Sequence, residues 1–134
     1  MTKPSSLAGL RVLVVDDDAT TRTLVSRTLL RMKVAATFEA DSGEQALEAF
    51  AATGPAIDLV ICDWTMPGMT GLDLFRRLRA ERPTLPFLML TGRADHDSLA
   101  LAQQAGVSGY AVKPISAQEL RAKIDALLGT GAEL

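Results

Sequence analysis

Apolar and polar positions follow two different periodicities along this chain. Short apolar runs typical of strands fall at residues 10–15, 34–40, 58–63, 86–90 and 107–112. After each run, apolar residues recur every three to four positions, which is typical of helices that bury one face. These segments predict helices over residues 19–32, 42–53, 71–81, 95–105 and 116–128. Strand and helix therefore alternate five times along the chain.

Strands that alternate with helices over short loops build a parallel sheet with helices on both faces. We therefore expect an α/β protein with a flavodoxin-like, doubly wound (βα)5 fold. Because right-handed crossovers leave few arrangements for five strands, the expected strand order is 2-1-3-4-5. Residues 1–134 are expected to form a single domain, with a core at about 10–128 and loose ends at 1–9 and 129–134.

The helical periodicity also predicts which side chains are buried. The first helix is expected to bury Leu24, Val25 and Leu29 and to leave Arg22 in solvent. The third helix is expected to bury one apolar stripe and to expose its arginines, Arg76, Arg77 and Arg79. Two helices begin with a pattern typical of a capping box, at Ser42 and Ser116.

Composition narrows the class of protein. With 134 residues, a net charge of −2 and a charged fraction of 22%, the chain resembles one ordinary globular domain. This charge gives no reason to expect a nucleic-acid or membrane surface, and no apolar run approaches the ~20 residues of a membrane span. The N-terminus lacks the apolar core of a signal peptide. The single cysteine, Cys62, excludes an internal disulfide and is expected in the core, so we predict a cytoplasmic protein.

Polar side chains follow four of the expected strands. Asp16 and Asp17 end the first strand, and Asp63, Thr91 and Lys113 end the third, fourth and fifth. Because the carboxyl ends of parallel strands share one edge, these groups should meet beside the switch between strands 1 and 3. Two carboxylates about 4 Å apart repel by about 4 kcal/mol at an effective dielectric constant of about 20. Either a raised pKa or a bound cation relieves this repulsion, and oxygen ligands at an open edge suit Mg²⁺.

This set of groups fits the transfer of a phosphoryl group to a carboxylate. Asp63 is the candidate nucleophile, and Mg²⁺ and Lys113 would neutralise the charge that develops on the phosphoryl oxygens. Thr91 would donate a hydrogen bond to one of these oxygens. The candidate catalytic residues are therefore Asp63, Thr91 and Lys113.

Four motifs together resemble the receiver domain of response regulators. In chain order they read Val-Val-Asp-Asp, Cys-Asp-Trp-Thr-Met-Pro-Gly-Met-Thr-Gly, Met-Leu-Thr-Gly and Tyr-Ala-Val-Lys-Pro. The resemblance covers residues 10–128, and Asp63-Trp64 followed by Met66-Pro67 is particularly similar to the chemotaxis receivers. It implies a stand-alone switch of two-component signalling. Asp63 would accept a phosphoryl group from a phosphohistidine of a sensor histidine kinase or phosphotransfer protein. The chain would act as no other enzyme beyond its own phosphorylation and dephosphorylation.

The resemblance also implies roles for individual residues. The implied Mg²⁺ ligands are Asp16, Asp17, Asp63 and the backbone carbonyl of Thr65. The implied switch pair is Thr91 and Tyr110, and the peptide bond between Lys113 and Pro114 would be cis. Thr65, Gly92 and Arg93 stand at positions that vary in the family and border the path of attacking water. The lifetime of the phosphoryl group is therefore left open.

A receiver without a DNA-binding domain would act through a protein contact. Phosphorylation would draw Thr91 toward the new dianion, and Tyr110 would turn inward into the vacated space. The surface that changes would be residues 95–128, where Leu99, Leu101 and several alanines offer few charges. Such a surface suits a partner helix or peptide. We expect a monomer that binds this target.

Two other functions fit parts of the pattern. Asp16-Asp-Asp18-Ala-Thr20 matches the Asp-x-Asp-x-Thr signature of haloacid-dehalogenase-like phosphatases, with Asp16 as nucleophile and Asp18 as general acid. That family also needs a later acidic pair and a cap over the substrate, and Asp63 would have no role in it. The other alternative is a pseudo-receiver, a binding module that needs no phosphate. Plainer explanations also exist, with residues 16–18 as a solvated strand end or helix N-cap and His96 as a solvated side chain.

Overall fold

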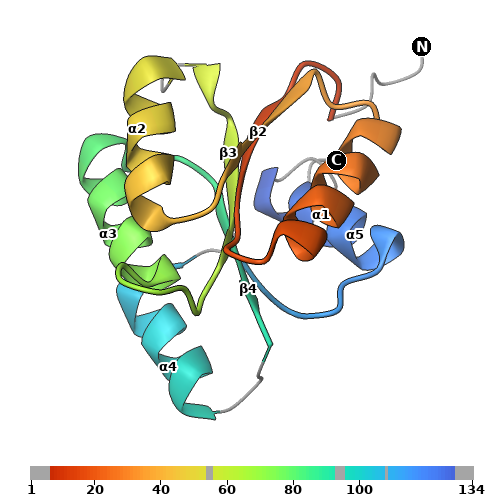
Figure 1. Ribbon diagram of the computed structural model, residues 1–134. Helices are drawn as coiled ribbons and strands as arrows, with labels where there is room; N and C mark the ends of the chain where they lie inside the picture. Colours follow the sequence, from red (N-terminus) through yellow and green to blue (C-terminus); the bar gives the residue numbers. More distant parts are fainter. Residues whose placement is uncertain (1–6, 54–55, 93–95, 108, 129–134) are drawn as a thin grey trace.

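The computed structural model describes residues 7–53, 56–92, 96–107 and 109–128, and for residues 53 and 96–99 only the backbone. Strands and helices alternate along the chain (Figure 1). The strands are β1 (Arg11–Val15), β2 (Ala36–Ala40), β3 (Leu59–Asp63), β4 (Phe87–Thr91) and β5 (Gly109–Val112). The helices are α1 (Ala19–Arg31), α2 (Gly43–Thr53), α3 (Gly71–Glu81), α4 (His96–Ala105) and α5 (Ala117–Leu128). Among these described helices, none combines the length and apolar character needed to cross a membrane.

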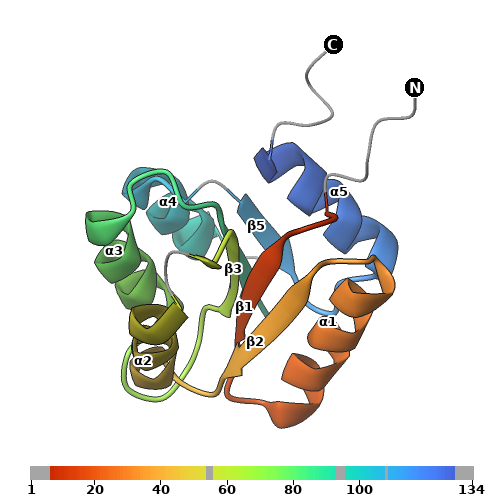
Figure 2. The same ribbon diagram turned by 90° about the horizontal axis from the view of Figure 1, so that it is seen from above.

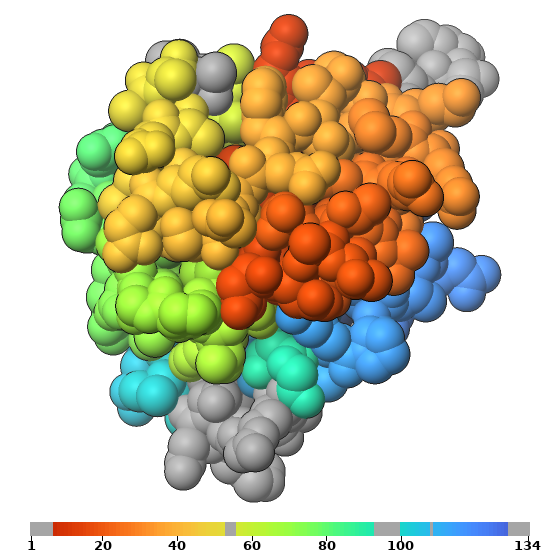
Figure 3. Space-filling model, viewed as in Figure 1, coloured from red at the N-terminus to blue at the C-terminus, as the bar shows by residue number. Residues whose placement is uncertain are grey.

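The five strands form one parallel sheet in the order β2-β1-β3-β4-β5, which confirms the predicted fold. The helices α1 and α5 cover one face of the sheet, and α2, α3 and α4 cover the other (Figure 2). The surfaces of α1 and α5 adjoin in the space-filling view (Figure 3). Because the winding reverses between β1 and β3, the carboxyl ends of these two strands flank the crevice where such folds bind ligands.

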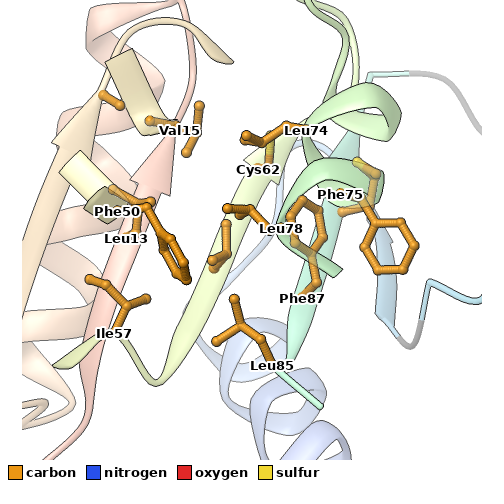
Figure 4. Packing of buried hydrophobic residues seen from close by; sticks show 14 of the residues in the cluster. Leu13, Val15, Phe50, Ile57, Cys62, Leu74, Phe75, Leu78, Leu85 and Phe87 are labelled. Carbon is orange, nitrogen blue, oxygen red and sulfur yellow. The ribbon is translucent and has the colours of Figure 1, made fainter. Parts of the chain in front are cut away.

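Alternate residues of the central strands supply two separate cores. Leu13, Val60, Cys62 and Phe87 point to the side of α2 and α3, and Val14, Ile61 and Leu88 point to the side of α1 and α5. Figure 4 shows the first of these cores, where side chains of α2 and α3 pack against the sheet. All residues of β3 and β4 are buried, including Cys62, which confirms its prediction as a core residue.

Side-chain caps begin α2, α3 and α5. The hydroxyls of Ser42 and Ser116 accept hydrogen bonds from backbone N–H groups three residues later, each at 3.0 Å, as their patterns predict. The Gln45 side chain reaches the N–H of Asp41 (2.6 Å). A full capping box formed by Thr70 and Asp73 begins α3. It has Asp where the usual pattern has Glu or Gln, and it places α3 directly after the loop that follows β3.

The prediction for α1 is wrong at two positions. Leu24 is 60% exposed, because Val25 and Leu29 occupy the face toward the sheet. It lines a hollow of about 290 Å³ between α1 and α5. Arg22 is only 19% exposed, since its guanidinium pairs with Glu39 at the end of β2 (3.0 Å). Helical periodicity predicts the stripe of α1 that faces the sheet, but it cannot show which other segments lie next to residues at the edge of that stripe, such as Arg22 and Leu24.

Of the arginines on α3, one is more than a solvated charge. Arg79 is exposed, as predicted, but its Nη1 donates to the backbone carbonyl of Gly106 at the end of α4 (2.9 Å). Its guanidinium also covers the ring of Phe75 at 5.0 Å. Arg79 therefore ties α3 to α4.

Candidate functional site

The strands β1 and β3 end side by side at the carboxyl edge of the sheet. Val15 pairs with Cys62, so Asp16 and Asp63 are the next residues of the two strands. One carboxylate oxygen from each of Asp16, Asp17 and Asp63 lies within 4.8 Å of the others. Asp16 and Asp63 are buried, whereas Asp17 is exposed. The structure thus brings together three carboxylates from two different strands.

Lys113 bridges the two buried carboxylates. Its Nζ lies 2.9 Å from Oδ2 of Asp16 and 3.2 Å from Oδ1 of Asp63. The backbone positions the lysine, because its N–H donates to the carbonyl of Thr91 (2.7 Å). The peptide bond between Lys113 and Pro114 is cis, as predicted. One ammonium against three carboxylates leaves the cluster with excess negative charge.

The pKa values of Asp63 and Lys113 are both raised, but for different physical reasons. Burial raises the pKa of Asp63, the charge of Asp16 raises it further, and Lys113 acts in the opposite direction. Burial alone would lower the pKa of Lys113, but its hydrogen bond to Asp16 and the charges of both carboxylates outweigh burial and raise it. Lys113 is therefore a fixed cation at neutral pH. Burial, together with the charges of Asp63 and Asp16, raises the pKa of the Cys62 thiol well above its usual range, so this cysteine stays protonated.

The acidic cluster fits a divalent cation. Three carboxylates offer hard oxygen ligands on one side of the edge, the donor type that Mg²⁺ takes in proteins. Two of them are buried, so their repulsion is poorly screened by water and a bound cation would relieve it. Thr65, the fourth predicted ligand through its backbone carbonyl, lies two residues beyond Asp63 with an exposed side chain.

A glycine that the motifs alone do not explain holds the loop after β3. The N–H of Trp64 donates to the carbonyl of Leu90 (2.7 Å), and its carbonyl accepts from the N–H of Gly71 (2.8 Å). A Cβ on Gly71 would collide with the carbonyl oxygen of Asp63 and lie 2.8 Å from Sδ of Met89. Only glycine lets α3 begin this close to the end of β3.

The predicted switch residues lie on neighbouring strands near this loop. Thr91 ends β4, is buried, and follows Leu90, which pairs with Asp63. Tyr110 pairs with Met89 across β4 and β5 and is partly buried. Its ring meets that of Trp64 edge-on, with the ring centroids 6.2 Å apart. An aromatic contact therefore links the residue after Asp63 to the predicted switch tyrosine.

Asp18, the general acid of the phosphatase alternative, caps a helix and is not part of the acidic cluster. Its carboxylate caps α1 and accepts hydrogen bonds from the backbone N–H (3.2 Å) and the hydroxyl of Thr21. These bonds lower the pKa of Asp18, which disfavours the protonated carboxyl that a general acid must supply. For Asp18, the plainer explanation as a helix N-cap is correct.

A parallel α/β sheet with an acidic cluster and a lysine at the switch edge defines a class of signalling receivers. The chain belongs to the response regulator receiver domain family, whose sequence model matches residues 12–125. It is 42% identical over 118 residues to the chemotaxis protein CheY of Pseudomonas aeruginosa, covering 87% of this chain and 94% of that protein. It is 40% identical over 119 residues to CheY-3 of Vibrio cholerae, covering 87% and 90%.

Solved structures agree with this assignment. A response regulator receiver domain protein from Clostridium thermocellum superposes with a TM-score of 0.82 at 29% identity, covering 92% of this chain and 97% of that one. The chemotaxis protein CheY4 of Vibrio cholerae superposes with a TM-score of 0.80 at 30% identity, covering 90% and 99%. The chain is therefore a CheY-like response regulator receiver of two-component signalling, a switch rather than a conventional enzyme. The phosphatase alternative is set aside.

Proposed function

We propose that this receiver accepts a phosphoryl group on Asp63 with the help of Mg²⁺. The donor is a phosphohistidine of a sensor histidine kinase or a phosphotransfer protein. The observation that carries the proposal is the position of Asp63, a buried strand-end carboxylate whose oxygens share a 4.8 Å cluster with Asp16 and Asp17. Lys113 lies 3.2 Å from its Oδ1.

In the proposed step, a carboxylate oxygen of Asp63 attacks the phosphorus atom, and the bond from phosphorus to the imidazole nitrogen breaks. The electron pair of that bond stays on the nitrogen, and Asp63 becomes an acyl phosphate. Asp16, Asp17, Asp63 and the carbonyl of Thr65 would hold Mg²⁺, which when bound neutralises charge on the phosphoryl oxygens. Lys113 donates a hydrogen bond to one phosphoryl oxygen, and Thr91 to another. In dephosphorylation, water attacks phosphorus, the bond from phosphorus to the Asp63 oxygen breaks, and inorganic phosphate leaves the free carboxylate behind.

The output in this proposal is a protein contact on the face of residues 95–128. Leu101 on α4 is 46% exposed and Val112 on β5 is 38% exposed, so this face offers apolar side chains in solvent. The side chain of Leu99, also predicted here, lies outside the described residues. The partner is a helix or peptide that binds the phosphorylated monomer more tightly, by about 1–3 kcal/mol of coupling free energy. A cytoplasmic location and the absence of nucleic-acid and membrane partners belong to the same proposal.

Labelling with acetyl phosphate in the presence of Mg²⁺ tests the acceptor. Asp63→Asn should abolish the label. Asp58→Asn is the matched control, because Asp58 lies at the opposite end of β3, where it accepts from the N–H of Arg11 (2.9 Å), and it should be labelled like the wild type. Full labelling of Asp63→Asn would refute the assignment. A wild type that neither acetyl phosphate nor any histidine kinase labels would favour the pseudo-receiver.

Hydrogen exchange tests the proposed relay through Thr91. Beryllofluoride, which mimics the phosphoryl group, should change the exchange of α4 and β5 in the wild type. Thr91→Ala should still bind the mimic at Asp63 but lose most of the change in α4 and β5. The same change in both proteins would exclude Thr91 as the relay.

A further inference from the structure

Arg22 makes two contacts that connect the acidic edge to β2. Its Nη1 donates to the backbone carbonyl of Asp16 (2.8 Å), and its Nε pairs with Oε1 of Glu39 (3.0 Å). The side chain is 19% exposed, less than the 40% of Glu39. A charged side chain thus reaches the main chain of the acidic cluster without touching a carboxylate of that cluster among its described contacts.

Asp16 is held at each of its polar atoms. Its N–H donates to the carbonyl of Ala40 (3.1 Å), and its carbonyl accepts from Arg22 (2.8 Å). Its Oδ1 accepts from the N–H of Asp18 (2.9 Å), and its Oδ2 pairs with Lys113 (2.9 Å). Of these four contacts, that of Arg22 acts on the peptide group that joins Asp16 to Asp17.

Control of that peptide group matters most for Asp17. Asp17 is the exposed member of the cluster, so burial does not fix its carboxylate. The carbonyl of Asp16 and the N–H of Asp17 belong to one planar peptide unit. A donor that holds the carbonyl therefore sets the direction in which the backbone of Asp17 leaves β1, and with it the position of the Asp17 carboxylate.

The chemistry of the guanidinium explains why an arginine stands here. Its rigid fork presents Nη1 and Nε to two acceptors at once, whereas the single nitrogen of a lysine has no such fixed pair of directions. Glu39 balances the charge of Arg22, so a hydrogen-bond donor stands beside the acidic cluster without adding net positive charge. An unpaired arginine at this place would repel a cation.

We propose that Arg22 is a positioning residue of the cation site and that Glu39 holds its guanidinium in place. The inference rests on the proposed function, since it concerns the Mg²⁺ that Asp16, Asp17 and Asp63 would hold. The competing explanation is that Arg22 only ties α1 to β2. That tie would affect the stability of the fold, but not the affinity of the folded protein for Mg²⁺.

The test measures the dissociation constant for Mg²⁺ by calorimetry and by Trp64 fluorescence, and measures urea unfolding separately in EDTA. Arg22→Ala should weaken Mg²⁺ binding by about tenfold or more, in the range found for residues that orient metal ligands. Arg22→Lys keeps the charge but not the fork, and it should lose most of the same affinity while unfolding close to the wild type. Arg27→Ala, an exposed arginine of the same helix, is the control and should bind Mg²⁺ normally.

Glu39→Gln separates charge from geometry. It leaves the charge of Arg22 unbalanced, so Mg²⁺ binding should weaken at low salt and recover toward the wild type at high salt. The loss in Arg22→Lys should persist at both salt concentrations. If the wild type binds Mg²⁺ and both Arg22 variants bind it equally well, the inference is overturned while the proposed function stands. A wild type that binds no Mg²⁺ would overturn both.

Discussion

Asp16 and Asp63 end neighbouring parallel strands, and both are buried, yet their surroundings differ. The side chain of Asp16 accepts from a backbone N–H and pairs with Lys113, and its carbonyl is held by Arg22. The side chain of Asp63 has Lys113 as its polar partner among the described residues. Its carbonyl lies against Gly71, with no room for a larger residue.

This difference separates two tasks that one amino acid can perform. A carboxylate held at both oxygens keeps its place when charges around it change, which suits a residue that positions a cation. A carboxylate with one charged partner keeps an oxygen available for a bond to phosphorus. Asp16 and Asp63 are therefore not interchangeable, although each is an aspartate at the end of a buried strand.

Removal of the shared partner should have the largest effect. Lys113→Met leaves two buried carboxylates without their cation, and we expect the metal-free protein to lose about 3 kcal/mol of unfolding free energy near neutral pH. Because the pKa of Lys113 is raised, the wild type keeps this contribution until alkaline pH. In the variant the loss should shrink in acid, where the carboxylates become protonated.

Urea unfolding in EDTA at neutral and acidic pH measures this effect. Lys123→Met, an exposed lysine on α5, is the control and should change little. An equal loss for Lys113→Met at both pH values would show that packing, and not charge, is responsible.

Gly71→Ala tests the close approach of α3 to the backbone carbonyl of Asp63, a contact described above for Asp63 and not for Asp16. The new Cβ would meet the carbonyl of Asp63 and Sδ of Met89, so α3 or β3 must shift, at a cost of about 1–3 kcal/mol. Gly92→Ala is the control, since a Cβ there meets no atom within 4 Å. Thermal unfolding of both variants measures the difference. If Gly71→Ala were as stable as the wild type, the backbone at the end of β3 could shift at little cost in free energy.

Neutral replacements sharpen the comparison of the two aspartates directly. Because burial raises the pKa of Asp63, its ionisation destabilises the metal-free fold as the pH rises above the ordinary carboxyl range. Asp63→Asn should therefore stabilise the metal-free protein near neutral pH by on the order of 1 kcal/mol, with no gain in acid. Asp16→Asn should destabilise it, because hydrogen bonds to a charged acceptor are weakened. Chemical unfolding of both variants across this pH range measures these changes in stability. Equal gains in stability in both variants would contradict the distinction between the two aspartates.

The smallest effect on stability is expected at Asp17. Its side chain is exposed, so Asp17→Ala should stabilise the metal-free fold only slightly, by less than about 0.5 kcal/mol. It should nevertheless remove most of the affinity for Mg²⁺, because one of the three ligands is lost. Trp64 fluorescence during a Mg²⁺ titration provides the measurement. Unchanged Mg²⁺ affinity together with a less stable metal-free protein would refute the role of the acidic cluster.

The local sequence pattern was sufficient to predict the fold and the polar groups that meet at the carboxyl edge of the sheet. Five apolar runs followed by five helical periods admit few topologies, and the observed strand order is the common one. Asp16, Asp63 and Lys113 could be placed together because parallel strands bring every carboxyl end to the same edge. On α3 the buried stripe was predicted correctly, since a strongly one-sided helix has only one way to lie on a sheet.

Tertiary contacts decided the rest, because they depend on distances between segments that are far apart in sequence. Arg22 meets Glu39 only because the start of α1 lies beside the end of β2, and helical spacing alone assigned it to solvent. Leu24 is exposed because the gap between α1 and α5 stays open beside it. The alternation along the chain by itself determined that carboxylates gather at one edge. Only the tertiary structure, which brings Lys113 from the end of β5 to both strand ends and turns the N–H of Asp18 toward Asp16, decided that Asp16 is held at both oxygens while Asp63 keeps one available.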